Sequence, residues 1–121
     1  MREPKITFRG WAGHFICSHN CKFRLNTLIE YQDIKIVVST VGLYLEPLIK
    51  KYEQIGAGRY FETMGFHAKF DGEFWDADVS KEISFSSRWS YPRIKNEQQA
   101  NDGHYVVIDE ICGRLKEGYK Y

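Results

Sequence analysis

Hydrophobic and polar positions alternate through much of the first three quarters of the chain, which is the period of a half-buried β-strand. The alternation is clearest over Lys22–Tyr31, although Leu28 interrupts it. One side of this segment carries Phe23, Leu25, Thr27 and Ile29, and the other carries Arg24, Asn26 and Glu30. Further strands are predicted at Trp11–Cys17, Ile34–Leu45, Arg59–Phe70 and Phe74–Phe85, and a short helical turn or loop at Leu48–Gln54.

Glycine and proline divide these segments. Pro47 ends the densely apolar strand before it, and Gly56-Ala57-Gly58 is a chain breaker. Asp71-Gly72, between two predicted strands, is a strong hairpin signal. The sequence therefore predicts an antiparallel arrangement in this region.

The last quarter of the chain has a helical period. Asn96 is suited to cap the helix, with Gln99 three residues on, and Gly118 is suited to end it. Gly103 and Gly113 weaken the interior of the predicted helix. The apolar stripe consists of Ala100, His104, Val107, Ile108, Ile111 and Leu115. We therefore predict a single α+β domain, residues 1–121, in which an antiparallel β-meander of about five strands precedes a C-terminal amphipathic helix.

Charge and composition narrow the class of protein. With 17 Lys+Arg against 16 Asp+Glu, the net charge of +1 argues against a duplex nucleic-acid binder. No apolar run approaches the roughly 20 residues that span a membrane, and no signal-peptide segment follows the charged N-terminus. We expect a cytoplasmic protein that is not membrane-bound, and its three cysteines argue against a disulfide framework.

Aromatic residues are abundant, with 8 Tyr, 8 Phe and 3 Trp making up 16% of the chain. A small domain cannot readily bury so many rings, so some are expected at a subunit interface or in a ligand site. Phe85, Trp89 and Tyr91 all have odd numbers, so their rings would lie on one face if the chain were extended there. They form either core or interface packing or a platform for stacking on a nucleobase. Polar residues that suit recognition of base edges or ribose follow directly: Asn96, Gln98, Asn101 and Asp102.

Three arginines are candidate phosphate ligands: Arg24, Arg59 and Arg114. Arg59 follows the Gly56-Ala57-Gly58 turn, whose backbone N–H groups also suit a phosphate. The alternative is that this is an ordinary turn and that Arg24 is simply an exposed side chain on its strand.

Two groups of residues raise the alternative of metal chemistry. Cys17, His19 and Cys21 would share one side of a strand, but their spacing is not that of a zinc knuckle. Asp76 and Asp78, with Glu62 and Lys81, would suit a metal-dependent nuclease or phosphodiesterase. The alternatives are buried thiols for the first group and an ordered turn at Asp78 for the second. No nucleophile elbow or Walker-type loop is present, and we expect no bound cofactor.

Six blocks spread over most of the chain resemble one family, the first-described family of phage Thoeris anti-defence proteins. The blocks are RGWAGHFI (9–16), FRLNTL (23–28), IVVSTVG (36–42), RYFETM (59–64), DVSKEI (78–83) and ANDGH (100–104). None is a generic motif, so joint agreement is specific. The segment 85–95 does not share the resemblance. The roles of its residues are therefore inferred from their side-chain chemistry and not from the family.

The resemblance implies a phage-derived protein that is not an enzyme. Members of that family bind cyclic ADP-ribose isomers made by bacterial TIR-domain defence proteins and sequester them unaltered. Some members also bind cyclic trinucleotides at separate sites in a hexamer, so a homo-oligomer, a dimer or a hexamer, is expected. We assign Ala12, Gly13, His14, Phe15 and Arg59 to one class of site, and Phe85, Trp89, Asn96 and Asn101 to the other. A third interpretation is a protein–protein interaction module whose aromatic face meets a macromolecule.

Overall fold

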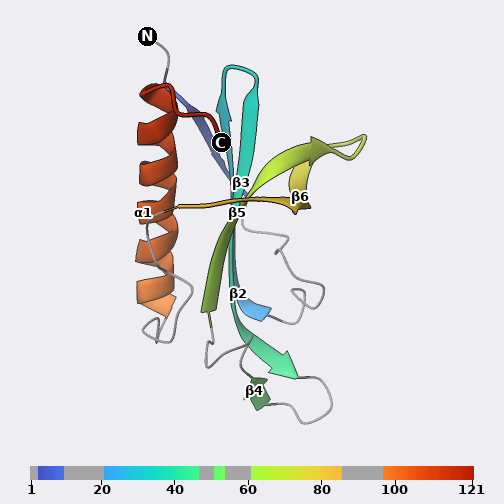
Figure 1. Ribbon diagram of the computed structural model, residues 1–121. Helices are drawn as coiled ribbons and strands as arrows, with labels where there is room; N and C mark the ends of the chain where they lie inside the picture. The colour runs from blue at the N-terminus through green and yellow to red at the C-terminus, as the bar shows by residue number, and fades with distance from the viewer. Residues whose placement is uncertain (1–2, 10–20, 47–50, 54–60, 86–96) are drawn as a thin grey trace.

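The computed structural model describes residues 3–9, 21–46, 51–53, 61–85 and 97–121 (Figure 1). These residues form six strands and one helix. The elements are β1 (Lys5–Phe8), β2 (Cys21–Tyr31), β3 (Ile34–Glu46), β4 (Lys51–Glu53), β5 (Phe61–Phe70), β6 (Trp75–Ile83) and α1 (Glu97–Lys116).

The strands form one antiparallel sheet in the order β1-β2-β3-β5-β6, with β4 paired to the end of β3. Helix α1 lies along one face of this sheet, and the β5–β6 hairpin projects away from the helix (Figure 1). The predicted α+β meander with a C-terminal helix is therefore confirmed.

Two short strands differ from the prediction. Strand β1 was not predicted, because four residues are too few for alternation to be recognisable; it pairs with β2 from Lys5 opposite Glu30 to Phe8 opposite Thr27. Strand β4 lies within the segment predicted as a helical turn or loop, where its pairing with β3 fixes an extended backbone. The strand predicted at Trp11–Cys17 lies outside the described residues.

The main core lies between α1 and the sheet. The predicted apolar stripe of the helix is confirmed, since all of its members are buried. Strand side chains from β2, β3 and β6 meet this stripe, and the smaller cluster of Phe61, Ala100 and Phe23 continues the core toward the start of the helix. The main cluster comprises Ile29, Ile36, Val38, Ile83, Val107, Ile108, Ile111 and Leu115.

His104 joins the helix to three strands through hydrogen bonds in this core. Its Nε2 lies 2.8 Å from Thr27 Oγ1 on β2, and its Nδ1 lies 2.7 Å from Thr40 Oγ1 on β3. Thr40 Oγ1 is also 2.8 Å from Thr63 Oγ1 on β5. All four side chains are buried, so each bond satisfies groups that would otherwise be costly to bury. Burial lowers the pKa of His104 to about 4, because it disfavours the charged imidazolium.

The opposite face of the sheet is also buried near its centre. Val37, Ser39 and Val41 alternate with the core-facing residues of β3, and all three have no exposed surface. Asn26 is only 3% exposed, which corrects its assignment to a polar, outward side of β2. The apolar Leu28 fits this face for the same reason.

The end of α1 and the β5–β6 turn lie where the sequence predicted them. At the end of α1, Gly118 has φ 88°, its N–H donates to the carbonyl of Leu115, and Tyr119 N–H donates to the carbonyl of Arg114. This is the Schellman arrangement, which favours glycine. In the β5–β6 turn, Asp71 Oδ1 accepts the N–H groups of Glu73 and Phe74, and these bonds lower the pKa of Asp71.

The neutral state of His104 predicts an acid-sensitive fold. The unfolded chain protonates His104 near its ordinary pKa of 6.5 and the folded chain near pH 4, so this contribution is intact above pH 6.5 and is lost as the pH falls toward 4. By pH 5 the loss is about 2 kcal/mol of unfolding free energy. Urea unfolding at pH 7 and pH 5 should show this loss in the wild type. The control variant His67→Gln should show the same loss, because it retains His104. An NMR titration in which the His104 ring protonates near pH 6.5 in the folded protein would contradict the prediction.

Close packing at Gly42 predicts an asymmetric response to alanine. A Cβ at Gly42 would overlap the ring of Phe61, its partner across β3 and β5. We expect Gly42→Ala to lower the unfolding free energy by about 1–3 kcal/mol. At Gly113 a Cβ meets nothing within 4 Å, so Gly113→Ala in the helix should raise it by roughly 0.5–1 kcal/mol. Equal effects at the two positions would show that the Phe61 contact is not the cause.

Candidate functional site

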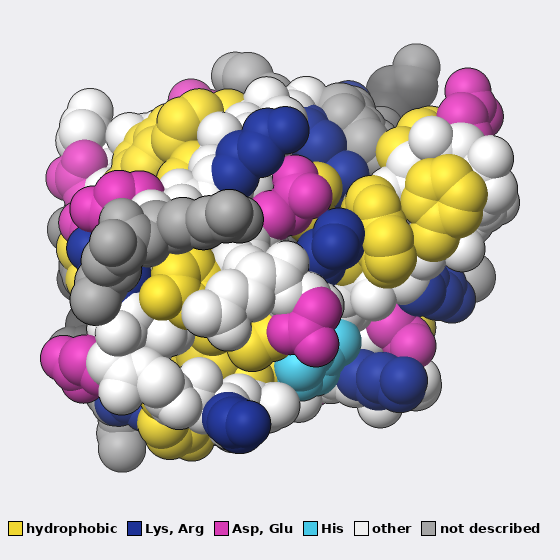
Figure 2. Space-filling view, turned by 90° about the horizontal axis from the view of Figure 1, so that it is seen from above, with side chains coloured by type: hydrophobic (Ala, Val, Ile, Leu, Met, Phe, Trp, Pro, Cys, Tyr) yellow, Lys and Arg dark blue, Asp and Glu magenta, His cyan; other side chains and the backbone are white. Residues whose placement is uncertain are grey.

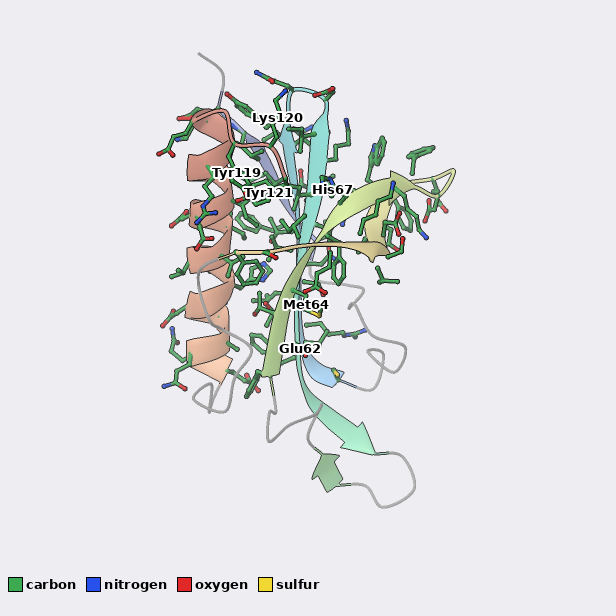
Figure 3. The ribbon with its side chains drawn as sticks, viewed as in Figure 1. Glu62, Met64, His67, Tyr119, Lys120 and Tyr121 are labelled. Atoms are coloured by element: carbon green, nitrogen blue, oxygen red, sulfur yellow. The ribbon has the colours of Figure 1, made fainter. Side chains whose placement is uncertain are left out.

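Arg24 lies on the face of the sheet that points away from α1. Arg24 is two residues before Asn26 on β2 and so points to the same side, whereas Thr27, of opposite parity, bonds to His104 on the helix side. Register places Arg24, Val41 and Glu62 in one row across three strands, and Asn26, Ser39 and Met64 in the next. Glu62 and Met64 are labelled on β5 in Figure 3. This part of the face, hereafter the Arg24 face, combines a cation with buried amide and hydroxyl groups.

Arg9 adds a second guanidinium to the Arg24 face. Its Nε donates to Asn26 Oδ1 at 2.8 Å, and its Nη1 donates to the carbonyl of Trp75. Burial lowers the pKa of Arg9, while the nearby carboxylates of Asp76 and Glu30 oppose that shift. The contact with Trp75 brings the end of the β1 segment to the start of β6, so the two edges of the coiled sheet approach one another. Sequence reasoning missed Arg9 because no spacing rule links it to Asn26.

Arg114 lies in a different place, at the end of α1. Its guanidinium carbon is 5.3 Å from the centroid of the Tyr119 ring, and Nη2 is 3.8 Å from Glu110 Oε2. The ring centroids of Tyr119 and Tyr121 are 4.7 Å apart. Burial raises the pKa of Tyr121 to about 12. Figure 3 shows both tyrosines beside the upper end of the helix. A cavity of about 310 Å³ adjoins this end and is lined by Tyr31, Gln32, Ile34 and residues 115–120.

Phe85 packs against the helix-side core. One of its ring carbons, Cε1, lies 3.8 Å from where a Cβ on Gly65 would be, and the ring also borders the main cluster. The core interpretation of Phe85 is thus the one that its described contacts favour.

Asn101 is half-buried in the first turns of α1, far from Arg114. The two residues are thirteen positions apart, which is about 20 Å along the helix and on roughly opposite sides of it. The structure therefore does not bring Arg24, Asn101 and Arg114 into one pocket of a single chain. The remaining predicted site residues lie outside the described part of the chain: Ala12, Gly13, His14, Phe15, Arg59, Trp89 and Asn96.

Two carboxylates of the alternative nuclease site, Asp76 and Asp78, accept local hydrogen bonds within strand β6. Asp78 Oδ1 accepts hydrogen bonds from Ser80 Oγ and N–H at 2.6 and 3.1 Å, which lower the pKa of Asp78. Asp76 accepts from the N–H of Ala77 and pairs in register with Lys69, seven residues along β5 from Glu62.

The described residues contain no group of three or more His, Cys, Asp or Glu side chains placed to hold a metal ion. Of the predicted thiol and imidazole group, only Cys21 is described, and it is buried and not in a disulfide. Cys17 and His19 lie outside the described ranges.

Comparison with known proteins gives no relative for this chain. No protein-family model matches it, and neither a curated protein nor a solved structure does. In the part of the chain that the structure describes, no helix is long and apolar enough to span a membrane.

The bonds of Arg9 predict a structural role for this side chain. Replacing Arg9 with Met keeps its length but removes both hydrogen bonds and leaves the Asn26 amide without the guanidinium partner. The unfolding free energy should fall by about 1.5–3 kcal/mol, the range for hydrogen bonds to charged groups. Arg24→Met is the matched control, and chemical denaturation should show little change in it. A control that unfolds as early as Arg9→Met would mean that any loss of charge on this face is destabilising.

Proposed function

We propose that this protein binds cyclic ADP-ribose isomers, and cyclic trinucleotides in addition, and sequesters them without cleavage. It would act in the cytoplasm of a bacterial host cell as a phage-derived immune evasion protein. The observation that carries the proposal is the Arg24 face, where Arg9 donates to the Asn26 amide and Arg24 lies two residues before Asn26 on the same side of β2. The resemblance of the six sequence blocks supports the same ligand class.

The chemistry of the Arg24 face suits an anionic cyclic dinucleotide-like ligand. A guanidinium presents a planar fork of donors that matches two phosphate oxygens, and its charge persists at neutral pH. Arg9 is held by Asn26 and Trp75, which limits the side-chain entropy that binding would cost. Sequestration needs slow release rather than an activated nucleophile, so fixed donors are sufficient.

The dispersal of the other predicted residues supports sites shared between copies of the chain. Arg24 lies on the sheet, whereas Asn101 and Arg114 lie at opposite ends of α1. A ligand that contacts residues from these surfaces together requires a second chain, so we propose a homo-oligomer, a dimer or a hexamer.

An exposed apolar patch offers a surface for such an assembly. The rings of Phe8 and Tyr105 lie 5.5 Å apart at the boundary of β1 and α1, and Phe8 is 60% exposed. Val106 is also exposed, and Asn101 lies one helical turn before Tyr105. Contact between copies through this patch would remove apolar surface from water and bring a second chain close to Asn101.

Release of intact ligand tests sequestration. The protein is incubated with a cyclic ADP-ribose isomer, passed over a desalting column and heated, and the released small molecule is identified by mass spectrometry. We expect the unaltered cyclic compound in near-stoichiometric yield. Recovery of a linear product would replace the proposal with an enzyme, and an EDTA arm together with Asp78→Asn would then test metal dependence. Recovery of no nucleotide would reject it outright.

Arginine substitutions test the phosphate contacts. Arg24→Ala should weaken binding of a cyclic ADP-ribose isomer by about 1.5–3 kcal/mol, as expected for a lost charged hydrogen bond. We expect Arg59→Ala to have an effect of the same size on at least one cyclic nucleotide. Lys5→Ala, an exposed change on β1, is the control. Calorimetric affinities that are equal for Arg24→Ala and Lys5→Ala would remove Arg24 from the site.

A further inference from the structure

A recess lies between the two hairpins of the sheet, and neither Arg24 nor Arg114 is among the residues that line it. The β2–β3 turn forms one wall and the β5–β6 hairpin forms the other. Its volume is about 360 Å³, within the range typical of small-molecule sites. The lining residues are Asp33, Ile34, Lys35, His67, Ala68, Trp75 and Lys81.

Trp75 holds one cation of this recess in place. Lys35 Nζ lies 4.8 Å from the centroid of the indole ring, within the distance of a cation–π contact. Trp75 itself packs against Phe70, with ring centroids 5.5 Å apart, and its carbonyl accepts from Arg9. Viewed from above, the hydrophobic side chains at the right of Figure 2 have Lys and Arg side chains beside them, where the β5–β6 hairpin lies.

The charges that line the recess favour an anion. Lys35 and Lys81 line the recess together with one carboxylate, Asp33. Among the described residues, neither lysine forms an ion pair within 4 Å. Of the nearby acids, Asp78 accepts hydrogen bonds from Ser80, and the charge of Lys81 adds to the lowering of the Asp78 pKa. Asp76 lies close enough to Arg9 to oppose the lowering of the Arg9 pKa by burial. Lys35 stands opposite Glu30 in the register, yet in the described part of the chain neither ammonium group is in an ion pair within 4 Å, so both can contact a ligand.

We propose that this recess is a second ligand site, which binds the phosphate or pyrophosphate group of a small molecule. Lys35 and Lys81 neutralise the anion, and the imidazole N–H of His67 is a third donor at the same opening. Lysine suits this role as a compact point charge with rotatable donors. Binding draws the Lys35 ammonium toward the anion and away from the indole ring, so Trp75 reports occupancy.

The probe for the experiment is inorganic pyrophosphate, titrated calorimetrically into the intact protein at low salt. The proposal predicts saturable binding that Lys35→Ala and Lys81→Ala each weaken about tenfold or more, with no effect from Lys5→Ala. Tryptophan fluorescence should change on binding in the wild type. In Trp75→Phe, which keeps an aromatic ring against Phe70, the fluorescence change should disappear while calorimetric binding persists.

Three outcomes overturn this site: no saturable binding, equal affinity in Lys35→Ala, Lys81→Ala and Lys5→Ala, or a fluorescence change that survives in Trp75→Phe. Arg24→Ala separates this site from the proposed function. It should leave pyrophosphate binding at the recess unchanged while weakening the cyclic ADP-ribose isomer. Loss of both in Arg24→Ala would mean that the recess is not an independent site.

Discussion

The attachment of α1 to the sheet through His104 is the constraint on which the rest of the structure depends. One imidazole links hydroxyls on β2 and β3, and Thr40 extends the link to β5, so the helix is fixed to the three central strands at one point. Apolar packing along the helix is non-directional and would tolerate sliding, whereas hydrogen bonds at both ring nitrogens define one register. Hydroxyls on both sides serve either tautomer of the neutral ring.

This attachment determines what the other face of the sheet can do. Because α1 covers one face, the residues of opposite parity on β2, β3 and β5 all point to the second face. There Asn26 is buried and bonded to Arg9, and Arg24 lies in the adjacent row. The helix thus serves as a support, and the polar groups proposed to recognise ligand lie on the sheet behind it.

The sequence predicted the fold better than the sites. The helical stripe and the Asp71-Gly72 turn are local signals, and both appear in the structure. Strand β2 also forms where the alternation predicts it, but its predicted outward side is buried at Asn26 and Leu28. The four-residue β1 pairs with the distant strand β2, and β4 has only three residues, paired to the end of the preceding strand β3. Neither strand is long enough for a local pattern to mark it. The contacts of Arg9 with Asn26 and Trp75 join residues 17 and 66 positions away, and sequence spacing carries no information about such pairs. For the same reason, the sequence does not show that Arg24, Asn101 and Arg114 lie on separate surfaces of one chain.

A crystal structure of the protein with a bound cyclic ADP-ribose isomer tests the central claim most directly. The account predicts an intact ligand ring on the Arg24 face, with the Arg24 guanidinium on its pyrophosphate and a second copy of the chain completing the enclosure. A ligand bound elsewhere with Arg24 facing solvent, or a cleaved ligand in the site, would contradict it.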